Sequence, residues 1–435
     1  MSKKQTLLKG TFILTLVGII TRIMGFFYRI FLSRTFHAEG VGLYQLIFPV
    51  YALCFSLTSA GIQVALSRMV ANRSALHKEK EAVLSLRTAL FLTTVLSLFT
   101  MVILQHFSGQ VAAHFLKESR CDVLLVAMSY ALPFAAIHSC ICGYYLGLKE
   151  IQIPALSQLY EQTARISSVW LFYRIGLHYS HDVHILIAVF GLVCGEFVAA
   201  ASSLYTIRHT LRHIPAKLPE YLAASGELLR LSAPLTANRV LLNILQSIEA
   251  ASIPLQLQIY GMTVSESLST YGILTGMALP CILFPSAITN SISTMLLPTV
   301  AEIQTAGSKN TMKTLVQKVS FSCFALGFLC MVIFFATGSF IGNIIFHNTE
   351  AGKFILILAF ICPFLYTNTA FTSVLNGLGK TGITFLINFL GLCVRIGSIF
   401  VFIPFYGILG YLWGLLASQL LIFLLSLRFL IRIQA

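Results

Sequence analysis

Long apolar runs that carry almost no charge dominate the chain. Cutting its 435 residues at charge clusters and at Gly, Pro or Asn turns leaves twelve mainly apolar windows. Each window is long enough to cross a bilayer, which takes about 20 residues. The windows cover residues 7–33, 40–70, 82–108, 121–148, 151–176, 182–207, 228–260, 268–301, 314–342, 353–378, 381–406 and 407–433. The sequence therefore predicts an all-α polytopic membrane protein with about twelve transmembrane helices, and it excludes a soluble fold.

Lys and Arg residues are distributed unevenly between the loops on the two sides of these windows. If the N-terminus is cytoplasmic, the cytoplasmic segments hold 15 or 16 of them, depending on how Lys9 is assigned, and the outer loops hold five. Short cytoplasmic loops accumulate Lys and Arg, so we expect both termini in the cytoplasm. The same distribution accounts for much of the net charge of +14, and no nucleic-acid partner is expected.

The longest polar stretch, residues 208–227, separates two halves with six windows each. Three dipeptides recur 230 residues apart: Pro133-Phe134 and Pro363-Phe364, Gly147-Leu148 and Gly377-Leu378, and Arg165-Ile166 and Arg395-Ile396. A six-helix unit repeated in one orientation predicts two pseudo-symmetric lobes with a site between them. We therefore expect an N-terminal lobe (1–207), a cytoplasmic linker (208–227) and a C-terminal lobe (228–435).

Several arginines lie inside the apolar windows, where each costs roughly 2.5–3.5 kcal/mol on insertion scales and usually faces a partner or a watery cavity. Two helical stripes share a spacing of four, three and four residues: Gly18, Arg22, Gly25 and Arg29 in the first window, and Ser232, Thr236, Arg239 and Asn243 in the seventh. Such a stripe either lines a cavity or packs two helices together. We interpret Arg22, Arg29, Arg239, Asn243 and Arg395 as a substrate-binding set that lines a cavity.

Three carboxylates lie clearly inside apolar windows: Glu161, Glu196 and Glu249. Glu161 precedes Arg165 by four residues, a favourable orientation for an ion pair on one helix. We expect this pair to be structural. Arg395 lacks such a neighbour, because Gly391 stands at the equivalent position.

Glu249 has two interpretations that the sequence leaves open. It could pair with Arg22 or Arg29 across the cavity, or it could be a cation-coupling site. With Arg239 and Arg395 also counted, the expected cavity carries a net positive charge. Such a cavity suits an anionic ligand.

No signature of an enzyme or a metal centre is present. The sequence has no P-loop and no HExxH motif, and its ten cysteines form no CxxC pair. We predict no catalytic residues, no metal and no cofactor. An ion gradient of Na⁺ or H⁺, or the membrane potential, is expected to supply the energy.

Residues 16–45, LVGIITRIMGFFYRIFLSRTFHAEGVGLYQ, resemble the first-helix region of the stage V sporulation protein B and polysaccharide-exporter family. This family belongs to the multidrug/oligosaccharidyl-lipid/polysaccharide flippase superfamily. The repeated blocks at 133–165 and 363–395 extend the resemblance over essentially the whole chain.

The TRxxGF core is also similar to the lipid II flippases of this superfamily, whose first helix carries cavity arginines. Arg22 matches one of these arginines, whereas Tyr28 stands at the second, with Arg29 beside it. Two features of the lipid II flippases have no match here: a further cavity arginine in the eighth helix, where residues 271–280 contain none, and two additional C-terminal helices.

The resemblance implies a monomeric, MATE-like transporter in the bacterial plasma membrane that works by alternating access. Its expected substrate is an anionic lipid-linked oligosaccharide, a peptidoglycan-type precursor for the spore envelope or cell wall. One alternative is a MATE-type cation or drug antiporter, which would need carboxylates in the cavity, with Glu249 as the main candidate. The other is a polytopic lipid-sugar transferase or polymerase, which would need large outer loops.

Overall fold

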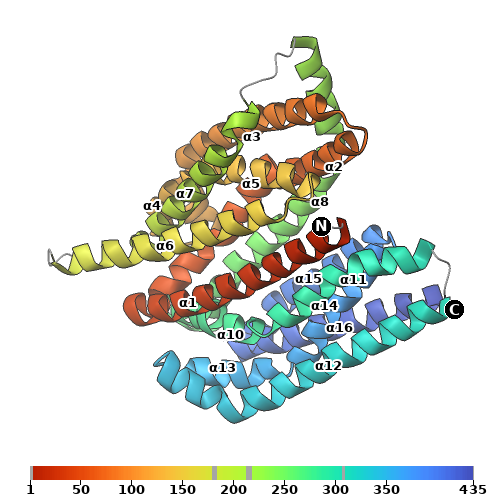
Figure 1. Cartoon of the computed structure of the whole chain (residues 1–435). Coiled ribbons are helices and arrows are strands. Elements are labelled where there is room, and N and C mark those ends of the chain that lie inside the picture. The colour runs from red at the N-terminus through yellow and green to blue at the C-terminus, as the bar shows by residue number, and fades with distance from the viewer. Residues whose placement is uncertain (1–2, 179–183, 212–217, 306–308, 435) are drawn as a thin grey trace. The chain divides into compact units, whose positions relative to one another are not determined.

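The chain folds into long helices joined by short turns. The computed structural model describes residues 3–178, 184–211, 218–305 and 309–434, and no strand occurs among them (Figure 1). Seven of its helical segments are each long and apolar enough to cross a membrane, and three further pairs of helices pass the same test as bent spans. The predicted all-α membrane fold is confirmed.

Two further features bring the number of spans to the expected twelve. The segment Leu16–Ala75 has 60 residues, about 90 Å of helix at 1.5 Å per residue, which is enough for two crossings. It is broken at His37, whose φ of 57° and ψ of 177° are not helical. Helix α6 (Gln152–His178) has 27 residues, which is also enough to cross, although Glu161 and Arg165 make it more polar than the other spans.

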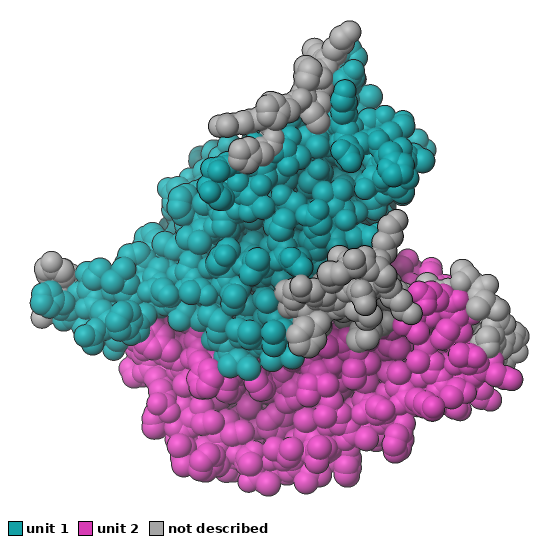
Figure 2. All heavy atoms as spheres, viewed as in Figure 1, with its two compact units in different colours: residues 1–25, 43–247 teal, residues 26–42, 248–435 magenta. Residues whose placement is uncertain are grey.

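The chain divides into two compact units, which are coloured separately in Figure 2. Unit 1 contains Met1–Gly25 and Leu43–Ser247, and unit 2 contains Phe26–Gly42 and Ile248–Ala435. The divisions therefore fall inside α1 (Lys3–Phe55) and α8 (Leu218–Ile259). The linker at 208–227, of which residues 212–217 lie outside the described residues, and the lobe limits that go with it remain predictions.

Unit 1 is built around a central helix, α5, which packs against α2, α3 and α7. Buried apolar side chains such as Leu66, Leu86 and Ile141 form its core. Its elements besides parts of α1 and α8 are η1 (Ser56–Ala60), α2 (Gly61–Ala75), α3 (Glu79–Gln110), η2 (Val111–Phe115), α4 (Cys121–Ser129), α5 (Ala131–Gly147), α6 and α7 (Leu186–Leu211).

Unit 2 repeats this plan around α14, which packs against α11, α12 and α16. Phe371 and Val374 of α14 are buried in its core. Besides parts of α1 and α8, its elements are η3 (Ile273–Ala278) and η4 (Ile341–Ile345), together with α9 (Val264–Gly272), α10 (Leu279–Leu283), α11 (Ser286–Thr305), α12 (Lys309–Phe340), α13 (Thr349–Ala359), α14 (Cys362–Gly377), α15 (Thr381–Tyr406) and α16 (Ile408–Gln434).

The backbone repeats at the same 230-residue interval as the sequence. The π-helix η2 in unit 1 recurs as the π-helix η4 in unit 2. Lys117 and His347 follow them with φ of 57° and 51°, and Lys149 and Gly379 share a left-handed turn with φ of 65° and 73°. The duplication that three dipeptides indicated is therefore also a duplication of local structure.

Candidate functional site

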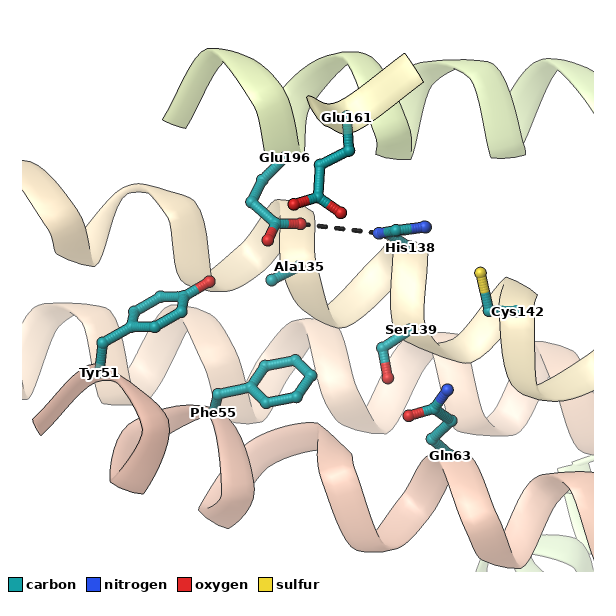
Figure 3. A pocket seen from close by; sticks show the side chains of 9 residues that line it. All are labelled: Tyr51, Phe55, Gln63, Ala135, His138, Ser139, Cys142, Glu161 and Glu196. Carbon is teal, nitrogen blue, oxygen red and sulfur yellow. Dashed lines mark ion pairs between the residues drawn. The ribbon is translucent and has the colours of Figure 1, made fainter. Parts of the chain in front are cut away.

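Unit 1 contains a partly open polar cavity of about 250 Å³ among its membrane helices (Figure 3). The residues that line it come from α1, α2, α5, α6 and α7: Tyr51, Phe55, Gln63, Ala135, His138, Ser139, Cys142, Glu161 and Glu196. An imidazole and two carboxylates therefore meet in one cavity inside an apolar helical unit.

The imidazole of His138 lies between a carboxylate and a hydroxyl group. Its Nδ1 atom is 3.6 Å from Oε2 of Glu196 on α7, the contact drawn as a dashed line in Figure 3. Its Nε2 atom is 3.0 Å from Oγ of Ser157 on α6. The hydroxyl of Ser157 donates to the carbonyl oxygen of Pro154 at 3.0 Å. Its oxygen is therefore placed to accept a hydrogen bond from Nε2.

Glu161 brings the second carboxylate, and it forms an ion pair with Arg165 one turn further along α6. The side chains of this pair are each 17% exposed. A ring nitrogen of His138 and carboxylate oxygens of Glu161 and Glu196 all lie within 4.8 Å of one another. Among the described residues, this group is placed to share one small cation.

Close helix contacts at glycines bring these side chains together. A Cβ atom on Gly143 of α5 would lie 2.8 Å from the carbonyl oxygen of Gln63, and one on Gly147 would lie 2.7 Å from that of Ser67. On α7, a Cβ atom at Gly195 would lie 2.9 Å from the carbonyl oxygen of Glu161. Small residues let helices approach closely in membranes, so these glycines set the positions of α5 against α2 and of α7 against α6.

Unit 2 holds a different polar centre. Arg395 of α15 donates from Nε to Oε1 of Glu249 at 2.7 Å and from Nη2 to its other oxygen. The hydroxyl of Tyr411 on α16 donates to Oε1 of Glu249 at 2.6 Å. Glu249 is 5% exposed, so this cluster fills the interior of unit 2 and ties α8 to α15 and α16.

The arginines and the asparagine that the sequence singled out are divided between the units. Unit 1 contains Arg22, Arg239 and Asn243, and unit 2 contains Arg29 and Arg395. Arg22 and Arg239 are exposed on α1 and α8. Asn243 donates from Nδ2 to the carbonyl oxygen of Ala52 at 3.2 Å, a contact between α8 and α1 inside unit 1. The role of these residues in substrate binding remains a prediction.

The structure changes the interpretation of two residues. Arg395 lacks a carboxylate one turn away, but Glu249 reaches it from another helix. Glu249 was expected to pair with Arg22 or Arg29, or to stay open for coupling, and its partner is instead Arg395. The contact joins residues 146 positions apart, so local spacing could not reveal it.

Sequence reasoning missed His138, and it treated Glu196 only as a membrane carboxylate. The internal repeat contained the signal. His138 corresponds to Asn368, 230 residues further along, and Glu161 corresponds to Gly391. These positions carry ionisable residues in one copy of the duplicated unit and neutral residues in the other. The shared fold therefore does not require an ionisable side chain there.

These features define the class of protein: a multi-pass helical membrane protein with two duplicated units and polar centres inside its apolar segments. The same fold occurs in an inward-facing MATE family transporter of the MOP superfamily, with a TM-score of 0.72, 13% identity and 98% of each chain covered. It also occurs in the inward closed lipid II flippase MurJ, with a TM-score of 0.72, 14% identity, and 95% of this chain and 86% of that chain covered.

The sequence places the chain more narrowly. A family model described as polysaccharide biosynthesis protein matches residues 7–304. Stage V sporulation protein B of Bacillus subtilis (strain 168) is 30% identical over 432 residues, which covers 97% of this chain and 83% of that protein. The chain therefore belongs to the polysaccharide biosynthesis protein family, and the resemblance to this family seen in its sequence is confirmed.

Proposed function

We propose that the protein is a flippase that moves an anionic lipid-linked oligosaccharide across the bacterial plasma membrane by alternating access. The expected substrate is a peptidoglycan-type precursor for the spore envelope or cell wall. Its family, and its likeness to proteins named as a sporulation protein and a lipid II flippase, support this proposal.

The observation that carries the proposal is the exposure of two arginine residues on apolar spans of unit 1. Arg22 lies on the candidate span Leu16–Ala75 and Arg239 on Pro219–Ile259. A charged side chain in this environment is costly and usually serves a ligand or a pathway. Guanidinium groups form paired hydrogen bonds with phosphate oxygens, so Arg22 and Arg239 suit the diphosphate bridge of a lipid-linked sugar.

Glu249, the main candidate residue for a cation or drug antiporter, is not available to bind a cation. A cationic drug would need an accessible carboxylate, whereas Glu249 is buried and is held by Arg395 and Tyr411. We favour an anionic substrate because of Arg22 and Arg239, and we propose that an ion gradient or the membrane potential drives its movement.

Transport by the purified, reconstituted full-length protein tests this function. Proteoliposomes would carry a fluorescent lipid-linked oligosaccharide, and its movement between leaflets would be followed by quenching from outside. The double variant Arg22→Gln/Arg239→Gln should translocate at least about tenfold more slowly. Each charge-assisted hydrogen bond contributes about 1.5–3 kcal/mol, and 1.4 kcal/mol corresponds to a factor of ten.

The matched control is Lys313→Gln, which removes an exposed cation near the start of α12. It should translocate at the wild-type rate. Absence of translocation by the wild-type protein would overturn the proposed substrate. Equal rates for the double variant and the control would overturn the role of the two arginines.

A further inference from the structure

The polar cavity of unit 1 has no part in the proposed binding of an anionic headgroup. Its carboxylates would repel such a ligand, and its side chains come from elements that all belong to one unit. Its hydrogen bonding and its charge both indicate another ligand.

The first argument is the hydrogen bonding of His138. The hydroxyl of Ser157 has one proton, and the carbonyl oxygen of Pro154 lies 3.0 Å away in position to accept it. With the proton placed there, the oxygen of Ser157 accepts from Nε2 of His138. A neutral imidazole carries one N–H, which this contact uses. Nδ1 would then direct a lone pair at the Glu196 carboxylate, 3.6 Å away. A proton on Nδ1 turns this repulsion into an ion pair.

The second argument is charge. Glu161 and Glu196 bring two negative charges into the cavity, and Arg165 brings one positive charge. An uncompensated charge inside a protein costs several kcal/mol. One further positive charge makes the cluster neutral, whereas a divalent metal ion would leave it with a net charge of about +1.

We propose that the cavity of unit 1 is a proton-binding site, in which one proton is held on Nδ1 of His138 against the carboxylate of Glu196. The nitrogen in the cluster favours a proton over a sodium ion, because hard metal ions prefer oxygen ligands. The site is independent of the proposed lipid substrate.

The elements around His138 add no competing charge to the cavity. Helix α6 contributes Glu161 and its partner Arg165, and α7 contributes Glu196. From α2 only the neutral amide of Gln63 faces the cavity, and α3 and α4 contribute none of its lining residues among those described. The thiol of Cys142 on α5 lies 3.5 Å from the hydroxyl of Ser157.

Two buried hydroxyl groups in the same cavity indicate that it holds a polar ligand or water. Oγ of Ser139 and the hydroxyl oxygen of Tyr51 are buried and have no hydrogen-bond partner among the described residues. Ser139 is only 6% exposed, and both hydroxyl groups point into the cavity (Figure 3). Buried hydroxyls of this kind are normally satisfied by a partner or an ordered water, so the cavity is suited to a polar occupant.

Unit 2 provides the internal comparison. Gly195 packs against the carbonyl oxygen of Glu161 in unit 1, and Ser418 donates to the carbonyl oxygen of the equivalent Gly391 in unit 2. This register aligns Glu196 with Gln419. Asn368 donates from Nδ2 to Oε1 of Gln419 at 3.0 Å. An amide pair thus occupies the positions of His138 and Glu196. The fold accepts a neutral pair here, so the ionisable pair of unit 1 is not needed for packing.

This comparison supplies the variant for the experiment. The double variant His138→Asn/Glu196→Gln gives unit 1 the side chains that unit 2 already carries, so it should fold. The full-length protein, labelled with ¹⁵N at histidine and placed in phospholipid vesicles, would be studied by solid-state NMR at about pH 8.5, where exposed histidines are neutral. The wild-type spectrum should contain one imidazolium signal, and the double variant should lose it.

The matched control is His114→Asn, which removes an exposed histidine outside the cavity and should keep the imidazolium signal. A cooperative melting transition of the double variant would establish that it is folded. The proposal is wrong if the wild-type protein lacks the signal, or if a folded double variant keeps it. It is equally wrong if adding sodium or zinc ions removes the signal, because a metal ion would then occupy the site.

Discussion

Arg165 and Arg395 stand at equivalent positions of the repeat, but the carboxylates that neutralise them come from different places. Arg165 takes Glu161 from its own helix, and Arg395 takes Glu249 from α8. The second pair therefore connects two helices that are distant in sequence. A buried pair of this kind contributes little net stability by itself, but leaving one member unpaired is strongly destabilising.

Removing one member of the Arg395–Glu249 pair should therefore lower the free energy of unfolding more than removing both members. We expect Arg395→Met to lower the free energy of unfolding by about 3–5 kcal/mol, because Glu249 would remain buried and charged. The double variant Arg395→Met/Glu249→Leu should recover most of this loss. Melting of the purified proteins in detergent would measure both effects, and additive losses in a double-mutant cycle would contradict the coupling.

The two ion pairs also show what a sequence can and cannot reveal at the scale of single residues. The pair Glu161–Arg165 follows from a four-residue spacing on one helix, which is a local property. The pair Glu249–Arg395 depends on the packing of α8 against α15, and the contact between His138 and Glu196 depends on the packing of α5 against α7. Such contacts need the tertiary arrangement, which hydropathy does not encode.

At the scale of helices, apolar length was a reliable guide. The windows 381–406 and 407–433 nearly coincide with α15 (Thr381–Tyr406) and α16 (Ile408–Gln434). The sequence did not reveal the bend of 40° between α4 and α5 inside the window 121–148. This region stays apolar through the bend, so its hydropathy gives no sign of it. Helix α8 begins at Leu218, within the predicted linker, because the polar residues there continue the same helix.

The glycines of α5 give a test at this scale. A Cβ atom on Gly143 would lie 2.8 Å from a backbone oxygen of α2 that has little room to move. We expect Gly143→Ala to lower the apparent melting temperature by several degrees, since about 1 kcal/mol shifts it by roughly 2–4 °C in a unit of this size.

Gly226→Ala on α8 is the matched control, because nothing lies within 4 Å of its added Cβ atom. It should melt at or slightly above the wild-type temperature, since alanine favours helix more than glycine does. Equal melting temperatures for the two variants would show that α5 and α2 can separate at little cost.

At the scale of the whole molecule, the net charge of +14 has two sources that bear on different properties. Most of the basic residues lie in loops and predict orientation. A few lie inside the membrane helices, where they are assigned to ion pairs, as with Arg165 and Arg395, or to the proposed binding of an anionic headgroup. The same total charge therefore bears on topology and on substrate, and the two contributions can be measured separately.

Orientation can be measured with cysteines placed at two turns on opposite sides of helix α3. Lys78 precedes α3 and Ser119 follows η2, and both are exposed. In a Cys393→Ser background, which removes the exposed native thiol, a membrane-impermeant maleimide should label Ser119→Cys in intact cells. It should label Lys78→Cys only after the membrane is permeabilised, because the excess of Lys and Arg predicts a cytoplasmic position for that turn. The reverse pattern would invert the whole topology. Both termini would then lie outside, and the loop charges would no longer account for the orientation.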